Sequence, residues 1–258
     1  MFGWMFNADD FECELKKRRE QTIDEIVEDF KFGSNRSVFD ESIRIDTGLL
    51  DDIDYLGEIY NVSTKVLINA LLTKSLSTVW ETVRSGEILV DILRRLKSET
   101  DDELVVNTIN DAVRRWKNFA IDITRGICAG KYQLHVYYYK ENVLNAINKI
   151  SRKIGVERAP LVRALIVLSL SECDKLGEGM KKVYKRISDE FYNKLNIIIN
   201  EILVVNILTT KVSLKKIKTD EKLRKWLYNK LETLEKYNAD YYNKITSVIG
   251  GDNDGGML

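Results

Sequence analysis

Residues that could carry catalysis are few in this 258-residue chain and lie far apart in it. The single histidine, His135, has no nucleophile or metal ligand at a useful spacing, and the sequence contains no glycine-rich phosphate loop. Cys13, Cys128 and Cys173 fall mostly on apolar helical stripes, which indicates buried thiols in a reducing compartment. Neighbouring carboxylates on the predicted helices point to different faces. We therefore expect no enzyme, no metal site, no cofactor and a cytoplasmic, intracellular location.

Polar and apolar residues alternate over a short stretch that begins at position 40. Ile43 and Ile45 occupy one side of the alternation, and Asp40, Ser42 and Arg44 occupy the other. A period of two is typical of a strand with one buried face. On the exposed face, an arginine can donate two parallel hydrogen bonds to paired acceptors, and a serine hydroxyl can donate or accept. The alternative is that Arg44 is an ordinary solvated charge.

The strand opens a pattern that occurs twice. Residues 42–76 and 136–170 align without a gap at an offset of 94, and apolar residues face apolar residues almost throughout. In both copies the period changes from two to that of a helix. The first helix of copy one carries its apolar stripe at Leu49, Ile53, Leu56 and Tyr60. A turn and a second helix are expected to follow.

Turn and cap residues fall at equivalent places in the two copies. Asn61 and Gly155 both suit the left-handed conformation that ends a helix. Ser63 can cap the second helix of copy one. Pro160, the only proline, falls in the first turn of the second helix of copy two, where proline is tolerated. The order strand, helix, turn, helix is therefore predicted for each copy.

This order resembles the ribbon-helix-helix family of DNA-binding proteins. The matching residues are SIRI, LLDDIDYLGEIYNVS and TKVLINALL in copy one, and HVYYYKENVLNAINKISRKIGVERAPLVRALIVL in copy two. Two motifs in one chain are similar to the tandem ribbon-helix-helix transcription regulators of archaeal filamentous viruses, which implies a viral protein inside an infected host cell. The implied fold class is mainly α, with two ribbon-helix-helix motifs, each a short strand plus two helices, joined and flanked by long helices.

The flanking segments are predicted to be helical. The expected parts are an N-terminal helical arm (1–38), a first motif with an extra helix (39–99), a connecting helix (100–131), a second motif (132–178), C-terminal helices (179–249) and a disordered tail (250–258). The apolar run within residues 181–208 is interrupted by Asn200, Glu201 and Asn206, which favours a buried or interface helix over a membrane span. We expect no membrane partner.

The resemblance implies a sequence-specific transcription regulator whose two-stranded antiparallel ribbon enters the major groove of double-stranded DNA. Its base-contacting residues would be Ser42, Arg44 and Asp40, and its phosphate-contacting residues Ser63, Thr64, Lys65 and Arg36. For Arg36 the alternative is a solvated charge. Lys plus Arg and Asp plus Glu number 40 each, so DNA binding has to depend on local patches, and acidic neighbours of the strand weaken it.

Copy two departs from this pattern. Its outward strand residues would be Leu134, Val136 and Tyr138. Glu157 replaces Ser63 at the helix start, where a carboxylate would oppose a phosphate. Apolar outward residues suit a protein contact, so we expect these three to form an oligomer interface. A one-residue slip in register is the alternative, and it would turn His135, Tyr137 and Tyr139 outward instead.

A lone strand leaves its backbone groups unpaired, so each motif needs a second strand. The two strands could pair within the chain or with a second chain. We favour pairing between chains, in a homodimer or a higher oligomer that assembles along DNA, because the two outward faces differ. The alternative function is a non-specific DNA-coating or structural assembly protein.

Overall fold

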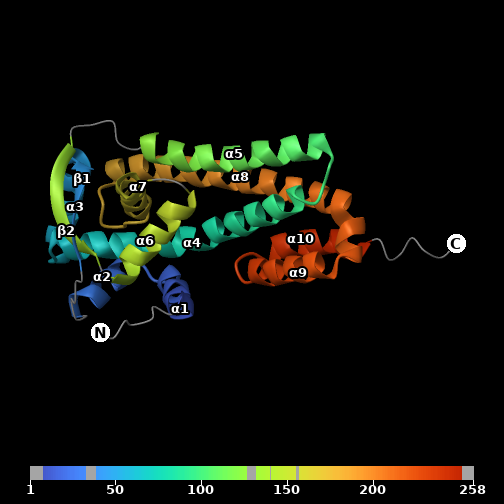
Figure 1. Ribbon diagram of the computed structural model, residues 1–258. Helices are drawn as coiled ribbons and strands as arrows, with labels where there is room; N and C mark the ends of the chain where they lie inside the picture. Colours follow the sequence, from blue (N-terminus) through green and yellow to red (C-terminus); the bar gives the residue numbers. More distant parts are fainter. Residues whose placement is uncertain (1–7, 33–38, 127–131, 140, 155–156, 252–258) are drawn as a thin grey trace. The chain divides into compact units, whose positions relative to one another are not determined.

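The computed structural model describes residues 8–32, 39–126, 132–139, 141–154 and 157–251. Of these residues, the side chains at positions 8–12, 14, 32, 39–44, 116–117, 119–126, 132–139, 141–142 and 153–154 lie outside the described part. The described residues form these elements (Figure 1): α1 (Ala8–Arg19), α2 (Ile23–Phe32), β1 (Phe39–Asp46), α3 (Thr47–Tyr60), α4 (Thr64–Lys97), α5 (Glu103–Gly126), β2 (Tyr132–Tyr139), α6 (Glu141–Ile154), α7 (Arg158–Leu170), α8 (Glu178–Thr219), α9 (Glu221–Glu235) and α10 (Ala239–Gly250).

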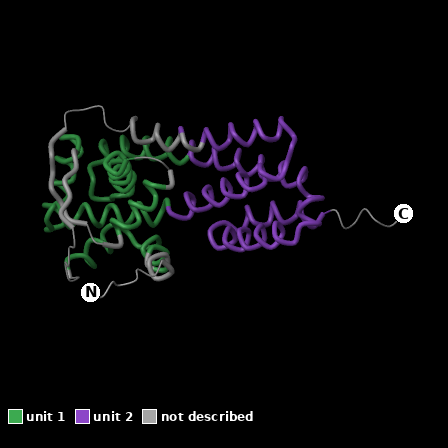
Figure 2. The backbone as a smooth tube through the Cα atoms, viewed as in Figure 1, with its two compact units in different colours: residues 1–79, 120–192 green, residues 80–119, 193–258 purple. Residues whose placement is uncertain are grey.

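The chain divides into two compact units (Figure 2). Unit 1 comprises Met1–Val79 and Ala120–Tyr192, and unit 2 comprises Trp80–Phe119 and Asn193–Leu258. The long helices α4 and α8 each contribute one part to either unit. Both strands and the two repeated segments fall in unit 1, which is therefore the unit that bears on the predicted site.

The strands of unit 1 form one two-stranded antiparallel ribbon. The register runs from Phe39 opposite Tyr139 to Asp46 opposite Tyr132. Helices α3 and α7 both contact β1. The side chain of Ile45 is fully buried, which confirms the inward face that the alternation predicts for this residue.

An internal pseudo-twofold relation organises unit 1. Helices α3 and α6 begin at Thr47 and Glu141, and 141 − 47 = 94. Helices α4 and α7 begin at Thr64 and Arg158, and 158 − 64 = 94. The repeat offset that the sequence predicts is thus confirmed in the positions of the helices, and α7 places Pro160 in its first turn as expected.

The expected fold class is wrong. The described residues are almost entirely helical, and their two strands form a single ribbon with each other. The chain therefore does not contain two ribbon-helix-helix motifs that each offer an open strand to a second chain. Pairing between chains, which we favoured, is also wrong for this ribbon. Two strands tethered in one chain meet at a high effective concentration, and their pairing satisfies the backbone groups without the entropy cost of association.

The extra helix expected after the first motif is part of α4 and not a separate helix. Helix α4 is continuous from Thr64 to Lys97. Hydroxyl-bearing residues within it bond back to carbonyls of the same helix, as Thr78 does to Lys74 at 3.1 Å and Ser85 to Glu81 at 2.9 Å. The hydrogen-bonding capacity of these hydroxyl groups is therefore met within α4, and the helix continues without a break.

The predicted N-terminal helical arm consists of two helices, α1 and α2. Thr22 begins α2 with reciprocal bonds to Glu25: the Thr22 backbone amide donates to the Glu25 carboxylate at 2.7 Å, and the Glu25 amide donates to the Thr22 hydroxyl at 3.2 Å. This capping box starts a new helix. Lys74 of α4 donates to the carbonyls of Arg19 and Gln21, both at 2.9 Å, and so holds the arm in unit 1.

A polar cluster in unit 1 centres on Tyr60, whose ring is buried. The Tyr60 hydroxyl donates to Asp24 and lies 3.6 Å from Sγ of Cys173. Lys175 Nζ is 3.1 Å from the Asp24 carboxylate and 4.0 Å from the Tyr60 ring centroid. Burial, and then the bond with Asp24, raise the pKa of Tyr60. Cys173 is buried, as expected for a thiol here, whereas Cys13 is exposed, and Cys128 lies outside the described residues.

Unit 2 is entirely helical in its described residues. Asn206 of α8 is fully buried and donates to the carbonyl of Leu89 at 3.1 Å and that of Ile202 at 3.0 Å. Arg84 lies over the rings of Trp80 and Tyr237, with the guanidinium 6.0 and 5.5 Å from the two centroids. Helices α9 and α10 pack together, and Asn238 caps α10 by accepting from the Tyr241 amide at 3.0 Å.

Helix α8 is the one described helix that is long and apolar enough to cross a bilayer by length and composition. Its most apolar window is 44% buried inside the fold. A core helix of a soluble protein passes the same test, so this feature is weak evidence for a membrane.

Candidate nucleic-acid interface

The predicted contact residues of the two strands lie opposite one another on one ribbon. The register pairs are Arg44 with Leu134, Ser42 with Val136 and Asp40 with Tyr138. Only the backbone of these residues belongs to the described part, and Arg36 lies outside it. The structure thus brings together the residues expected to read DNA and those expected to hold chains together. A division of labour between two separate ribbons does not apply.

The pair at the centre of the ribbon is Ser42 with Val136, and 136 − 42 = 94. These two residues are equivalents under the repeat offset, so the pseudo-twofold axis passes through this pair. The ribbon consequently has two halves that are alike in backbone but different in sequence. On β1, Arg44 takes the register position next to the buried Ile45.

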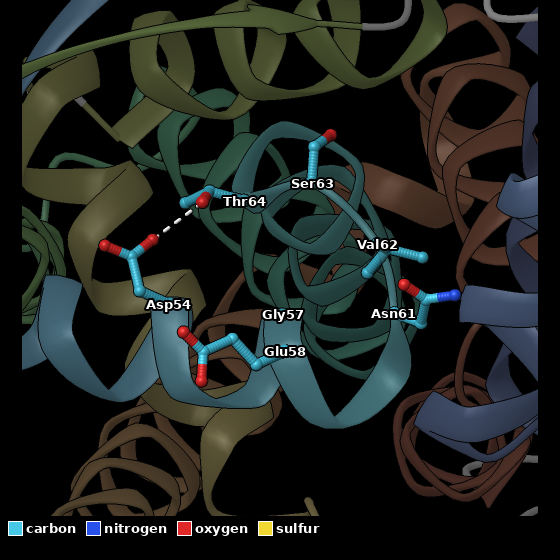
Figure 3. A pocket seen from close by; sticks show the side chains of 7 residues that line it. All are labelled: Asp54, Gly57, Glu58, Asn61, Val62, Ser63 and Thr64. Carbon is cyan, nitrogen blue, oxygen red and sulfur yellow. Dashed lines mark hydrogen bonds between the residues drawn. The ribbon is translucent and has the colours of Figure 1, made fainter.

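The predicted phosphate contacts of copy one lie where α3 meets α4, at a hollow of about 610 Å³ (Figure 3). We call this region the α3–α4 corner, and it is lined by Asp54, Gly57, Glu58, Asn61, Val62, Ser63 and Thr64. Lys65 is partly buried and does not line the hollow.

Local geometry forces a tight turn at this corner. Asn61 ends α3 in the left-handed conformation, with φ of 52°, as the sequence predicts. A Cβ at Gly57 would lie 3.1 Å from the carbonyl oxygen of Val62, so glycine permits the close approach of the two segments. Ser63 caps α4, because its hydroxyl accepts from the Val66 amide at 3.4 Å and its carbonyl accepts from Leu67.

The charge at the α3–α4 corner does not favour a phosphate. Asp54 and Glu58 are exposed and lie one turn apart on the face of α3 that lines the hollow. The Thr64 hydroxyl already donates to the Asp54 carboxylate at 2.6 Å (Figure 3). Two carboxylates beside Ser63 and Thr64 repel an anion. The predicted phosphate contacts at these residues stay a prediction.

The equivalent α6–α7 corner has the opposite charge. We define it by the residues 94 positions after the α3–α4 corner that carry its polar side chains: Asn148, Ser151, Arg152, Glu157 and Arg158. Arg158 Nη1 donates to Asn148 Oδ1 at 3.4 Å, at the same two positions as the bond between Thr64 and Asp54. Unlike Ser63, Glu157 makes no side-chain capping bond.

The sequence analysis noted Glu157 but missed the charges around it. The signal was available, because the offset that aligns apolar positions also aligns Glu58 with Arg152 and Asp54 with Asn148. Only the bonded pairs show that these positions form the two corners.

Among the described residues, no group of three or more histidine, cysteine or acidic side chains could hold a metal ion. Comparison of the chain with protein-family models, with curated proteins and with solved structures finds no match. A functional assignment therefore depends on the residues and their geometry.

Proposed function

We propose that this chain is a sequence-specific DNA-binding transcription regulator that inserts its ribbon, β1 with β2, into the major groove. The observation that carries the proposal is the antiparallel register of one two-stranded ribbon, centred on Ser42 and Val136. A ribbon of this kind has the width that the major groove of B-DNA admits. The helices that contact β1 cover its other face, where Ile45 is buried.

Arg44 is the residue proposed to read a base. Its register position alternates with Ile45, so the strand period assigns it to the face away from the core. From there a guanidinium can donate to O6 and N7 of guanine. Ser42 and Asp40 occupy the next positions on the same face and are proposed to contact the neighbouring base pairs.

Closure of the ribbon within one chain changes the expected target. Opposite Arg44 and Ser42 stand Leu134 and Val136, which cannot form polar contacts but can pack against a thymine methyl group. The pseudo-twofold axis relates Arg44 to Tyr138 and Asp40 to Leu134, so the two halves of the ribbon present different side chains and demand different bases. We propose an asymmetric site for one chain, and an inverted repeat only where two chains bind side by side.

Selection from a pool of random duplexes tests the proposal. The full chain is incubated with the pool, and bound duplexes are amplified over several rounds. The affinities for the selected duplexes and for random duplex are then compared by fluorescence anisotropy at fixed salt. We expect an asymmetric consensus bound at least a hundredfold more tightly than random sequence. Binding of both at equal affinity would indicate a DNA-coating protein, and no binding of either would refute DNA binding.

A further inference from the structure

The α6–α7 corner and the α3–α4 corner occupy equivalent places in unit 1 but carry opposite charge. At the offset of 94, Glu58 of α3 corresponds to Arg152 of α6, and Thr64 corresponds to Arg158. Arg152 and Arg158 are exposed, as are Asp54 and Glu58 on the other side. The internal repeat thus places the helices at equivalent positions in the two corners, and the corners carry side chains of opposite charge.

The basic side chains of the α6–α7 corner gather on one face. Asn148 and Arg152 are four residues apart on α6, which places them one above the other. Arg158, the first residue of α7, contacts Asn148 and therefore lies next to this face. Glu157 is the one acidic residue of the corner as we define it.

We infer that the α6–α7 corner binds the DNA phosphodiester backbone and that the α3–α4 corner is held away from it. This inference depends on the proposed function, because the ribbon has to be in the groove for either corner to meet a strand. Guanidinium groups pair with phosphate oxygens through two parallel hydrogen bonds, which makes arginine suited to this contact. Carboxylates at the equivalent corner repel the second strand.

The consequence is that the ribbon is held to a phosphate strand on one side only. The pseudo-twofold axis passes through the Ser42–Val136 pair of the ribbon, so the two corners are related across the ribbon centre. Both DNA strands carry the same phosphate charge, so the corners do not decide in which direction the ribbon enters the groove. The bases that Arg44 and its neighbours contact decide that direction.

A charge-swap experiment tests the inference on the full chain. Arg152→Gln/Arg158→Gln removes two positive charges, Asp54→Asn/Glu58→Gln removes two negative charges at the equivalent corner, and Arg114→Gln removes an exposed charge of unit 2 as a control. Affinity for the selected duplex is measured by anisotropy over a series of KCl concentrations. Sedimentation velocity without DNA is run on the same samples, and circular dichroism confirms that each variant is folded.

We expect the arginine double variant to bind the selected duplex at least tenfold more weakly, with a slope of log affinity against log salt reduced by about two. The carboxylate double variant should bind several-fold more tightly, and Arg114→Gln should bind as the wild type does. Unchanged affinity and slope in the arginine variant, beside a wild type that binds, would overturn the inference alone. So would a smaller sedimentation coefficient with unchanged DNA binding, since the corner would then contact another chain. Failure of the wild type to bind would overturn the proposed function itself.

Discussion

Ser75 and Ser169 hydrogen-bond to each other in the core of unit 1, although they are 94 residues apart in the chain. Each hydroxyl, which has a single proton to donate, also lies within hydrogen-bonding distance of a carbonyl of the opposite helix: Ser75 of Leu165, and Ser169 of Leu71. Leu71 and Leu165 are themselves 94 residues apart, since 165 − 71 = 94. Ser75 therefore contacts the equivalent of Leu71, and the equivalent of Ser75 contacts Leu71 itself. A twofold axis produces such reciprocal contacts.

Removal of one of these hydroxyls should weaken unit 1. Ser75→Ala leaves the Leu165 carbonyl without this donor in a site where both serines are almost fully buried. We expect a loss of about 1–2 kcal/mol in the free energy of unfolding, measured by urea denaturation. Ser98→Ala is the control, because its hydroxyl bonds to Arg95 at an exposed helix end, and it should cost less than about 0.5 kcal/mol. The double variant Ser75→Ala/Ser169→Ala should cost less than the sum of its singles; additive effects would contradict the shared bond.

A disulfide across the ribbon tests whether its strands belong to one chain. Cysteines at Ser42 and Val136, which are direct partners in the register, are introduced into a chain whose native cysteines are replaced by alanine. After oxidation we expect a crosslinked single chain on a non-reducing denaturing gel, because directly opposed residues of an antiparallel pair lie close enough to be bridged. Ser42→Cys/Gln133→Cys, which is three positions out of register, should crosslink poorly. Disulfide-linked dimers as the main product would show that strands pair between chains.

Local signals in the sequence were sufficient for the helices of the repeat. The starts of α3 and α6, and of α4 and α7, follow from the change of period and from the offset of 94. The left-handed Asn61 and the capping Ser63 follow from residue type. Each of these features depends on a few neighbouring residues, so the sequence contains the information directly.

The features that the sequence analysis missed depend on partners distant in the chain. The sequence of the strand that contains Arg44 does not indicate whether the partner strand belongs to the same chain. The covalent connection between the two strands decides this, because it gives them a high effective concentration for pairing. The opposed corners required knowledge that Thr64 bonds to Asp54. The helix starts at Thr22 and Asn238 are a different case, because their capping residues were visible in the sequence and were overlooked.

The buried Tyr60 should make unit 1 sensitive to alkali. Burial, followed by the bond with Asp24, raises the pKa of Tyr60 above its ordinary value of 10.0, whereas in the unfolded chain it titrates near that value. Above pH 10 the unfolded state therefore binds fewer protons than the folded state, and stability falls as pH rises. Below that pH the contribution of Tyr60 is fully present.

Urea denaturation of the wild type and of Tyr60→Phe across pH 8 to about 11.5 measures this effect. At pH 8 the variant should be less stable by about 1 kcal/mol, because it lacks the bonds to Asp24 and Cys173. Above pH 10 the wild type should lose stability more steeply, by up to about 1.4 kcal/mol per pH unit. The pKa values of Tyr192 and Tyr241 are also raised, but these residues are present in both proteins and cancel in the comparison. If the free energies of unfolding of the two proteins fell in parallel above pH 10, folding would not raise the pKa of Tyr60.

The most direct test of DNA reading by the ribbon is the affinity ratio between the selected duplex and random duplex for Arg44→Ala and Arg114→Ala. Both variants lose one arginine, but Arg114 belongs to unit 2, where its exposed side chain pairs with Asp111 at 3.1 Å. Loss of a base contact by Arg44→Ala should lower the ratio by about 5- to 150-fold and relax the preference at one base pair, while Arg114→Ala should leave the ratio unchanged. An unchanged ratio in Arg44→Ala, or an equal loss in both variants, would contradict the account.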